Sequence, residues 1–153
     1  MLVLVHGVFD VLHIGHLHYL REARKLGDFL LVTITADRYV TRGIGQPLFA
    51  EQHRKEMLEA LRCVDQCEII YEPSAVTAIN VYRPDIYVKG IDYKSEDKIG
   101  NLEKERQLVE SYGGRLVILE TEVQCSSTEI MTGTMLSTKR TTGLLSLSPR
   151  KKN

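Results

Sequence analysis

The sequence predicts an α/β fold in which a doubly wound, parallel five-stranded sheet forms a single Rossmann-like domain. Five short apolar and β-branched runs lack the polar alternation of a sheet with one wet face, so we expect strands that are covered on both sides. Helical patterns separate these runs, and such alternation is typical of parallel sheets with right-handed crossovers. Sheets of this kind bind ligands at the carboxyl ends of their strands.

The boundaries of the expected elements follow from local signals. The strands cover residues 2–5, 29–35, 67–71, 86–88 and 116–119. In the first helix, Leu17, Leu20 and Ala23 share one face before Gly27 ends the helix. The remaining helices are expected over residues 57–64, from Pro73 to just before Arg83, and from an N-cap at Asn101 to Gly113.

Composition excludes several classes of protein. The chain has 153 residues, 43% of them hydrophobic and 26% charged, so we expect one domain with its own core. Twenty basic and twenty acidic residues cancel, which argues against a nucleic-acid partner. No apolar run approaches the roughly 18 residues that cross a bilayer, and residues 1–5 do not resemble a signal peptide, so we expect a cytoplasmic protein without membrane contact. Three cysteines, an odd number, favour reduced thiols.

The C-terminal residues differ from the rest of the chain. We expect the domain to comprise residues 1–136, because residues 137–153 lose periodicity and collect Ser, Thr, Lys and Arg. This composition predicts a disordered basic tail, and attachment of the tail to a membrane or to nucleic acid is the alternative.

A histidine-rich turn follows the first expected strand. Gly7 lets a ligand approach the backbone closely at the strand end, and a helix beginning near His16 points free N–H groups and its positive dipole end at an anion. His13 and His16 add donors that can become cationic. The turn therefore suits a phosphate that gains negative charge in a transition state.

This turn resembles the signature Gly-x-Phe-Asp-x-x-His-x-Gly-His of the cytidylyltransferase-like nucleotidyltransferases. The matching residues are Gly7, Phe9, Asp10, His13, Gly15 and His16. The resemblance implies that His13 and His16 stabilise the α-phosphate of a nucleoside triphosphate, and that Asp10 orients a histidine or the loop. It also implies nucleotide contacts by Gly7, Val8, Phe9 and Gly15.

A second segment, residues 125–130, resembles the Ser/Thr-rich turn and helix start that hold the triphosphate in this family. Alone it could be an ordinary helix cap. Together with the histidine turn it favours phosphate binding, with Ser126, Ser127 and Thr128 facing His13 and His16 across the site.

Residues 88–93 resemble the corresponding segment of the heptose-phosphate adenylyltransferases, which implies nucleotide contacts by Lys89, Gly90 and Asp92. Other segments are shared in part with the glycerol-phosphate cytidylyltransferases. They include Arg54, which we expect to bind substrate and which could instead be a solvated helix residue. The resemblance covers roughly residues 1 to 131.

The chain departs from the family pattern in two places. Family members usually carry one or two lysines in the loop after the second strand, whereas residues 39–46 contain only Arg42 as a basic residue. We expect Arg42 to replace a lysine in substrate binding. The basic residue often found beyond the Ser/Thr turn is also absent, because Ile130 and Met131 follow Glu129.

The resemblance implies an enzyme that joins a nucleoside triphosphate to a phosphorylated sugar or polyol and releases pyrophosphate. ATP with heptose 1-phosphate is the first expectation, and CTP with glycerol 3-phosphate or another polyol phosphate is the alternative. A non-catalytic nucleotide-binding protein is the third reading, since the loop lysine and the distal basic residue are missing. Mg²⁺ is expected with the triphosphate, without a separate metal site on the protein, and homodimers are common in the family.

Overall fold

The computed structural model describes residues 1–41, 47–90, 99–120 and 127–133. Its centre is a five-stranded sheet in the order β3-β2-β1-β4-β5, in which every neighbouring pair is parallel. The strands are β1 (Leu2–Gly7), β2 (Phe29–Thr35), β3 (Gln66–Ile70), β4 (Ile86–Gly90) and β5 (Arg115–Leu119). The predicted doubly wound parallel sheet in a single Rossmann-like domain is thereby confirmed.

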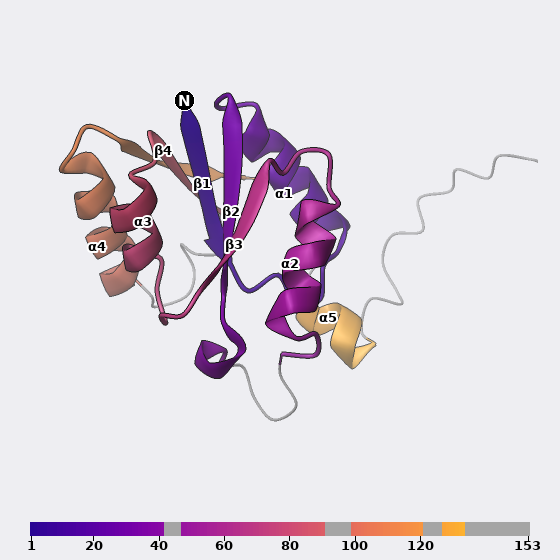
Figure 1. The fold of residues 1–153 in the computed structure, drawn as a ribbon. Helices are drawn as coiled ribbons and strands as arrows, with labels where there is room; N and C mark the ends of the chain where they lie inside the picture. The colour runs from indigo at the N-terminus through magenta and orange to yellow at the C-terminus, as the bar shows by residue number, and fades with distance from the viewer. Residues whose placement is uncertain (42–46, 91–98, 121–126, 134–153) are drawn as a thin grey trace, which may run out of the picture.

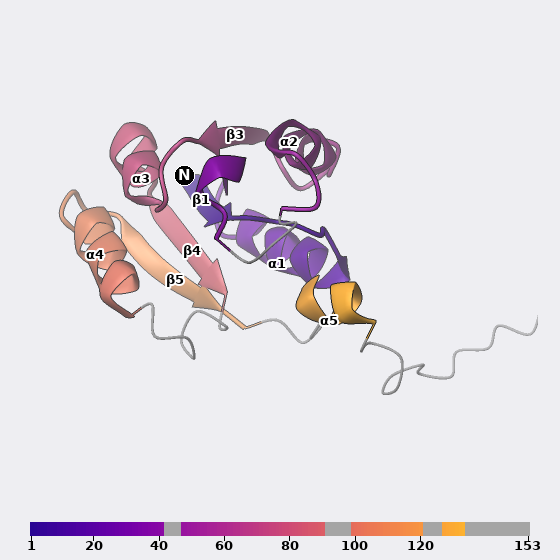
Figure 2. The same cartoon turned by 90° about the horizontal axis from the view of Figure 1, so that it is seen from below.

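Two helices cover each face of the sheet. The helices are α1 (Ile14–Arg24), α2 (Glu51–Glu59), α3 (Val76–Tyr82), α4 (Ile99–Glu110) and the short α5 (Ser127–Thr132), with one 3₁₀ turn, η1 (Asp37–Tyr39). In Figure 1, α1 and α2 lie on one side of the strands and α3 and α4 on the other, and Figure 2 shows the same arrangement from below. Both faces of the central strands are therefore covered, which is why those strands read as apolar runs.

Alternation along β1 divides the core into two clusters. Val3 and Val5 pack with Leu20 of α1 and Leu58 of α2, whereas Leu4 packs with Ile79 of α3 on the other face. All six side chains are almost completely buried.

Several helix boundaries differ from the sequence-based predictions. The second helix ends at Glu59 rather than reaching residue 64, and Val64 nevertheless packs into the core from the turn that follows. Core packing, not helical periodicity, therefore accounts for the apolar residue at that position. Helix α4 already begins at Ile99, so Asn101 lies in its first turn rather than at its N-cap, and α3 begins at Val76 rather than at Pro73.

The chain order reverses between β1 and β4. From β1 the chain runs outward to β2 and β3, then returns to the other side of β1 to form β4 and β5. Val5 pairs with Val88 near the carboxyl ends of these two central strands. Because doubly wound sheets bind ligands at such a switch point, the loops after β1 and β4 bound the candidate site.

Two further features are the lengths of the helices and the state of the cysteines. Within the described ranges, no helix is long and apolar enough to cross a membrane. Cys63 and Cys67 are free thiols, and Cys125 lies outside the described residues.

Candidate active site

The histidine turn connects the carboxyl end of β1 to the start of α1. Helix α1 begins at Ile14, two residues earlier than expected, and His13 is its N-cap. Nδ1 of His13 accepts a hydrogen bond from the backbone N–H of His16 at 3.4 Å. A ring nitrogen that accepts must be unprotonated, so the ring proton of neutral His13 is on Nε2, which is then a donor. Burial lowers the pKa of His13 from its usual value and favours this neutral form.

The two signature histidines lie against each other. Their rings are stacked with centroids 3.8 Å apart, and the ring of Phe9 meets that of His16 edge-on at 5.0 Å. His13, His16 and Phe9 therefore form one packed group at the N-terminus of α1. Such packing restricts the rotamers of both imidazoles before any ligand is bound.

The backbone before this group has an unusual conformation. Phe9 has a φ angle of +53°, in the left-handed region that non-glycine residues rarely adopt. Gly7 sits against the ring of Phe9, because a Cβ at Gly7 would lie 3.0 Å from Phe9 Cε2. A left-handed residue persists where surrounding contacts hold it, and contacts from three other parts of the chain do so here.

The first of these contacts comes from Leu48 and Phe49, whose backbone binds the side chain of Asp10. The Asp10 carboxylate is buried and accepts hydrogen bonds from the backbone N–H groups of Leu48 (2.6 Å) and Phe49 (3.1 Å). Of the two roles that the resemblance implied for Asp10, these contacts correspond to orienting a loop. Asp10 thus joins the histidine turn to the residues that precede α2.

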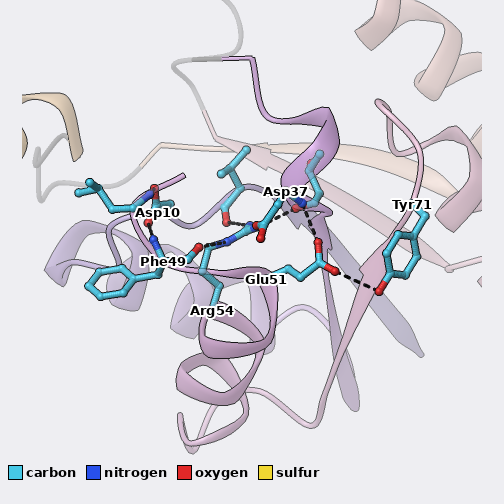
Figure 3. Close-up of polar contacts among 9 residues, drawn as sticks. Asp10, Asp37, Phe49, Glu51, Arg54 and Tyr71 are labelled. Atoms are coloured by element: carbon cyan, nitrogen blue, oxygen red, sulfur yellow. Dashed lines mark hydrogen bonds and ion pairs between the residues drawn. The ribbon is translucent and has the colours of Figure 1, made fainter. Parts of the chain in front are cut away.

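The second contact comes from Arg54 of α2, which is completely buried. Its guanidinium donates to the carbonyl oxygens of Val8 (2.7 Å), Thr35 (2.9 Å) and Phe49 (3.0 Å) and to Asp37 Oδ1 (2.6 Å), as Figure 3 shows in part. The alternative that Arg54 is a solvated helix residue is therefore wrong. Every described contact of the guanidinium is internal, so these contacts give its expected binding of substrate no support.

The third contact comes from Ser127 at the start of α5. Its hydroxyl donates to the carbonyl oxygen of Val11 at 3.0 Å, across 116 residues of sequence. The structure thus brings the start of the Ser/Thr segment to the histidine turn, and both figures place α5 beside the start of α1. Thr128 is the next residue of α5, whereas Ser126 lies outside the described residues.

Lys89, at the end of β4, is buried rather than open to solvent. Its Nζ lies 3.5 Å from Glu105 Oε2 of α4 and 5.3 Å from the ring of Tyr87, whose hydroxyl donates to the same carboxylate at 2.9 Å. The expected nucleotide contact of Lys89 stays a prediction. Gly90 has no described atom near the position of an added Cβ, so packing alone does not require glycine there.

A buried polar group beside Lys89 was missed by sequence reasoning. The two ring nitrogens of His6 are hydrogen-bonded to the hydroxyls of Thr33 (2.9 Å) and Thr35 (3.2 Å) on β2. Burial, with a smaller effect of the nearby Lys89 charge, lowers the pKa of His6 to about 3. The signal that could have revealed this group is the alternation of Thr33 and Thr35 in an otherwise apolar strand, opposite a histidine that interrupts the apolar run of β1.

Other expected site residues fall outside the described part of the chain. They are Arg42 and Asp92. Within the described residues, no group of three His, Cys, Asp or Glu side chains could hold a metal ion. The two carboxylate oxygens of Asp10 already accept backbone N–H groups. The described residues therefore include no such cluster of side chains for the expected Mg²⁺.

The sheet order and the histidine turn at its switch point define a Rossmann-like nucleotidyltransferase. The chain belongs to the cytidylyltransferase-like family, whose model matches residues 4–133. The resemblance inferred from the signature is thereby confirmed.

Relatives and solved structures agree with this assignment. The chain is 40% identical over 131 residues to the "Bifunctional protein HldE" of Syntrophotalea carbinolica (84% of this chain, 26% of that protein) and 39% identical over 112 residues to that of Helicobacter pylori (71% and 24%). It spans about a quarter of the length of these curated relatives. It is also similar to a lipopolysaccharide core biosynthesis protein from Thermoplasma volcanium, with a TM-score of 0.63, 29% identity, and coverage of 82% of this chain and 98% of that one. A pantothenate synthetase from Thermus thermophilus, at 13% identity and a TM-score of 0.57 over 84% of this chain and 60% of that one, shares the fold alone.

Proposed function

We propose that this domain transfers a nucleoside monophosphate from a nucleoside triphosphate to the phosphate of a sugar phosphate and releases pyrophosphate. The observation that carries the proposal is the stacked pair of His13 and His16 at the N-terminus of α1, beside the carboxyl end of β1. A helix N-terminus with adjacent imidazoles favours a phosphate on which negative charge develops.

In the proposed reaction an oxygen of the acceptor phosphate attacks the α-phosphorus. A new P–O bond forms, the bond to the oxygen bridging the α- and β-phosphates breaks, and pyrophosphate leaves. The acceptor phosphate is ionised at neutral pH, so the reaction needs positioning and charge stabilisation more than a general base. Neutral His13 would donate from Nε2, while His16 and the free N–H groups at the start of α1 would face the same developing charge.

A sugar phosphate as acceptor, with ATP as donor, is supported by three observations. Residues 88–93 resemble heptose-phosphate adenylyltransferases, the HldE relatives match over most of this chain, and one similar structure is a lipopolysaccharide core biosynthesis protein. The cytidylyltransferase-like family description favours a second candidate, transfer from CTP to glycerol 3-phosphate or another polyol phosphate.

A pyrophosphate-release screen tests both candidates. It crosses ATP, CTP, GTP and UTP with heptose 1-phosphate, glycerol 3-phosphate and other sugar phosphates, with Mg²⁺ and with excess chelator. The variant carrying both His13→Ala and His16→Ala is the control. We expect release with ATP and a sugar phosphate. Release only with CTP and a polyol phosphate would support the second candidate, and release no greater than in the control with every pair would contradict both.

A further inference from the structure

Arg54 and Asp10 are joined by hydrogen bonds through the backbone of Phe49. Arg54 Nε donates to the Phe49 carbonyl oxygen, and the Phe49 N–H donates to Asp10 Oδ1. Arg54 Nη1 also donates to the carbonyl oxygen of Val8, two residues before Asp10. We call this closed ring of Val8, Asp10, Phe49 and Arg54 the Phe49 clamp.

The Phe49 clamp encloses the left-handed residue of the histidine turn. Phe9 lies between Val8, whose carbonyl oxygen is held by Arg54, and Asp10, whose carboxylate is held by two backbone N–H groups. The ring of Phe9 in turn packs edge-on against His16. A shift of the clamp would therefore move Phe9 and, through its ring, His16.

We propose that Arg54 and Asp10 are positioning residues that act through the Phe49 clamp to hold the histidine turn in its active geometry. The proposal rests on the proposed function, since it concerns the turnover of the same site. It assigns neither residue a contact with substrate.

The hydrogen bonds of Arg54 favour positioning over substrate binding. An arginine side chain has five N–H donors, and four described bonds from Arg54 end on protein oxygens. The side chain is 0% exposed, so a substrate phosphate could reach the guanidinium only by displacing one of these partners. The planar guanidinium group of arginine can donate to several separate oxygens at once, whereas the ammonium group of lysine acts as a single point of charge.

A second layer of contacts holds the clamp from the side of β3. Glu51 accepts from the backbone N–H of Asp37 at 2.7 Å and from the hydroxyl of Tyr71 at 3.1 Å, and Asp37 binds Arg54. Figure 3 shows these residues in one continuous network. The network links the residues that follow β1, β2 and β3, the three strands whose carboxyl ends lie side by side.

The test compares Arg54→Lys and Asp10→Asn with the wild type. Arg54→Lys keeps the positive charge but removes the planar guanidinium group. Asp10→Asn keeps the volume of the side chain while replacing one acceptor oxygen with a donor. Arg62→Ala is the matched control, because Arg62 is an exposed arginine just beyond the same helix. Two readouts are needed: steady-state kinetics with both substrates, and hydrogen exchange of the Leu48 and Phe49 amides by NMR, which requires no activity.

We expect both clamp variants to lose about a hundredfold in kcat, as small misplacements of reacting groups can cause, with each KM within about threefold of the wild type. Exchange at the Phe49 amide should quicken by about tenfold or more in both variants. In Asp10→Asn the Phe49 N–H loses its charged acceptor, and in Arg54→Lys the Phe49 carbonyl loses the donor that holds this residue against Asp10. The Arg62→Ala variant should match the wild type in both readouts.

Each contrary result points to a different failure. Unchanged exchange in both variants would overturn the proposal whatever the kinetics, as would faster exchange with unchanged kcat. A raised KM for one substrate at normal kcat would make Arg54 a binding residue instead. Should Arg54→Lys not fold, Asp10→Asn still shows whether loss of the clamp quickens exchange of the Phe49 amide and lowers kcat. If the wild type itself transfers no nucleotide, the proposed function fails, while hydrogen exchange still shows whether the clamp exists.

Discussion

Asp10 and Arg54 bind the backbone of Phe49 from opposite sides: the carboxylate accepts from its amide nitrogen at 3.1 Å and the guanidinium donates to its carbonyl oxygen at 3.0 Å. Asp10 belongs to the family signature, whereas Arg54 lies on α2, more than forty residues later. The signature aspartate therefore holds the histidine turn by binding a segment that is distant in the sequence, the residues just before α2. This explains how a left-handed phenylalanine is held in the turn at the carboxyl end of the central strand β1.

The first prediction concerns the stacked histidines. His16→Ala should lower turnover by about a hundredfold or more, because one preorganised donor to developing charge is worth roughly 3 kcal/mol. His13→Ala should do the same, and the double variant should lose little more, since the rings stack as a unit. Single-turnover and steady-state rates at saturating substrates measure this, and near-wild-type turnover would exclude the role.

The capping role of His13 calls for a separate variant. His13→Ala also removes the acceptor for the His16 N–H, which should cost about 1 kcal/mol of folding stability. His13→Asn offers a side-chain oxygen as cap but no Nε2 donor. We expect it to unfold at nearly the wild-type urea concentration and still to lose turnover. If His13→Asn keeps full turnover, His13 serves only as a cap.

The second prediction concerns Gly7. An added Cβ would come within 3.0 Å of the Phe9 ring, which is itself packed against His16. Gly7→Ala should therefore cost about 1–3 kcal/mol of stability and lower kcat by about tenfold. Gly27→Ala is the control, because its Cβ would meet Met1 O at 2.6 Å and Val3 Cγ2 at 2.7 Å, away from the histidine turn. It should lose stability with kcat intact, and equal kcat losses in both variants would contradict the proposed path through Phe9.

The fold and the central turn were predictable for different reasons. The strands could be recognised because both faces are buried, and the site could be placed because the signature follows β1 at the switch point. The burial of Arg54 could not be predicted, because an arginine in a polar helical pattern resembles a surface residue until its four acceptors are brought together. The pairing of Lys89 with Glu105 likewise depends on how α4 crosses the sheet, which no local pattern encodes.

The third prediction concerns pH and His6. The pKa of His6 is about 3 in the fold, whereas an unfolded histidine titrates near 6.5. Between these values the unfolded chain binds a proton that the folded chain does not, so stability should fall as the pH drops from 6.5 toward 3. One such proton removes about 1.4 kcal/mol per pH unit well below pH 6.5 and half that at pH 6.5, which gives about 1.6 kcal/mol between pH 6.5 and 5.

A matched variant isolates this effect. His6→Gln keeps polar atoms near Thr33 and Thr35 but does not titrate. Urea unfolding at several pH values should show the wild type losing about 1.6 kcal/mol more than His6→Gln between pH 6.5 and 5. Other titrating groups contribute equally to both proteins and cancel in the difference. Parallel stability curves would mean that His6 is protonated as readily in the fold as outside it.

The fourth prediction separates the structural role of Lys89 from its expected nucleotide contact. The Lys89–Glu105 pair is buried, with side chains 2% and 5% exposed and 3.5 Å between Nζ and Oε2. Glu105→Gln keeps a partner for Tyr87 but removes the carboxylate from a buried cation, so it should cost about 3 kcal/mol. Lys89→Met combined with Glu105→Gln removes both charges and should regain most of that loss, since an uncharged pair has no desolvation cost to offset.

The KM for the nucleoside triphosphate is then measured in the double variant, where stability no longer obscures binding. A KM raised about tenfold or more supports a nucleotide contact by Lys89, as expected when a charge-assisted hydrogen bond is lost. An unchanged KM would restrict Lys89 to holding α4 against β4, and failure of the double variant to regain stability would contradict the pairing itself.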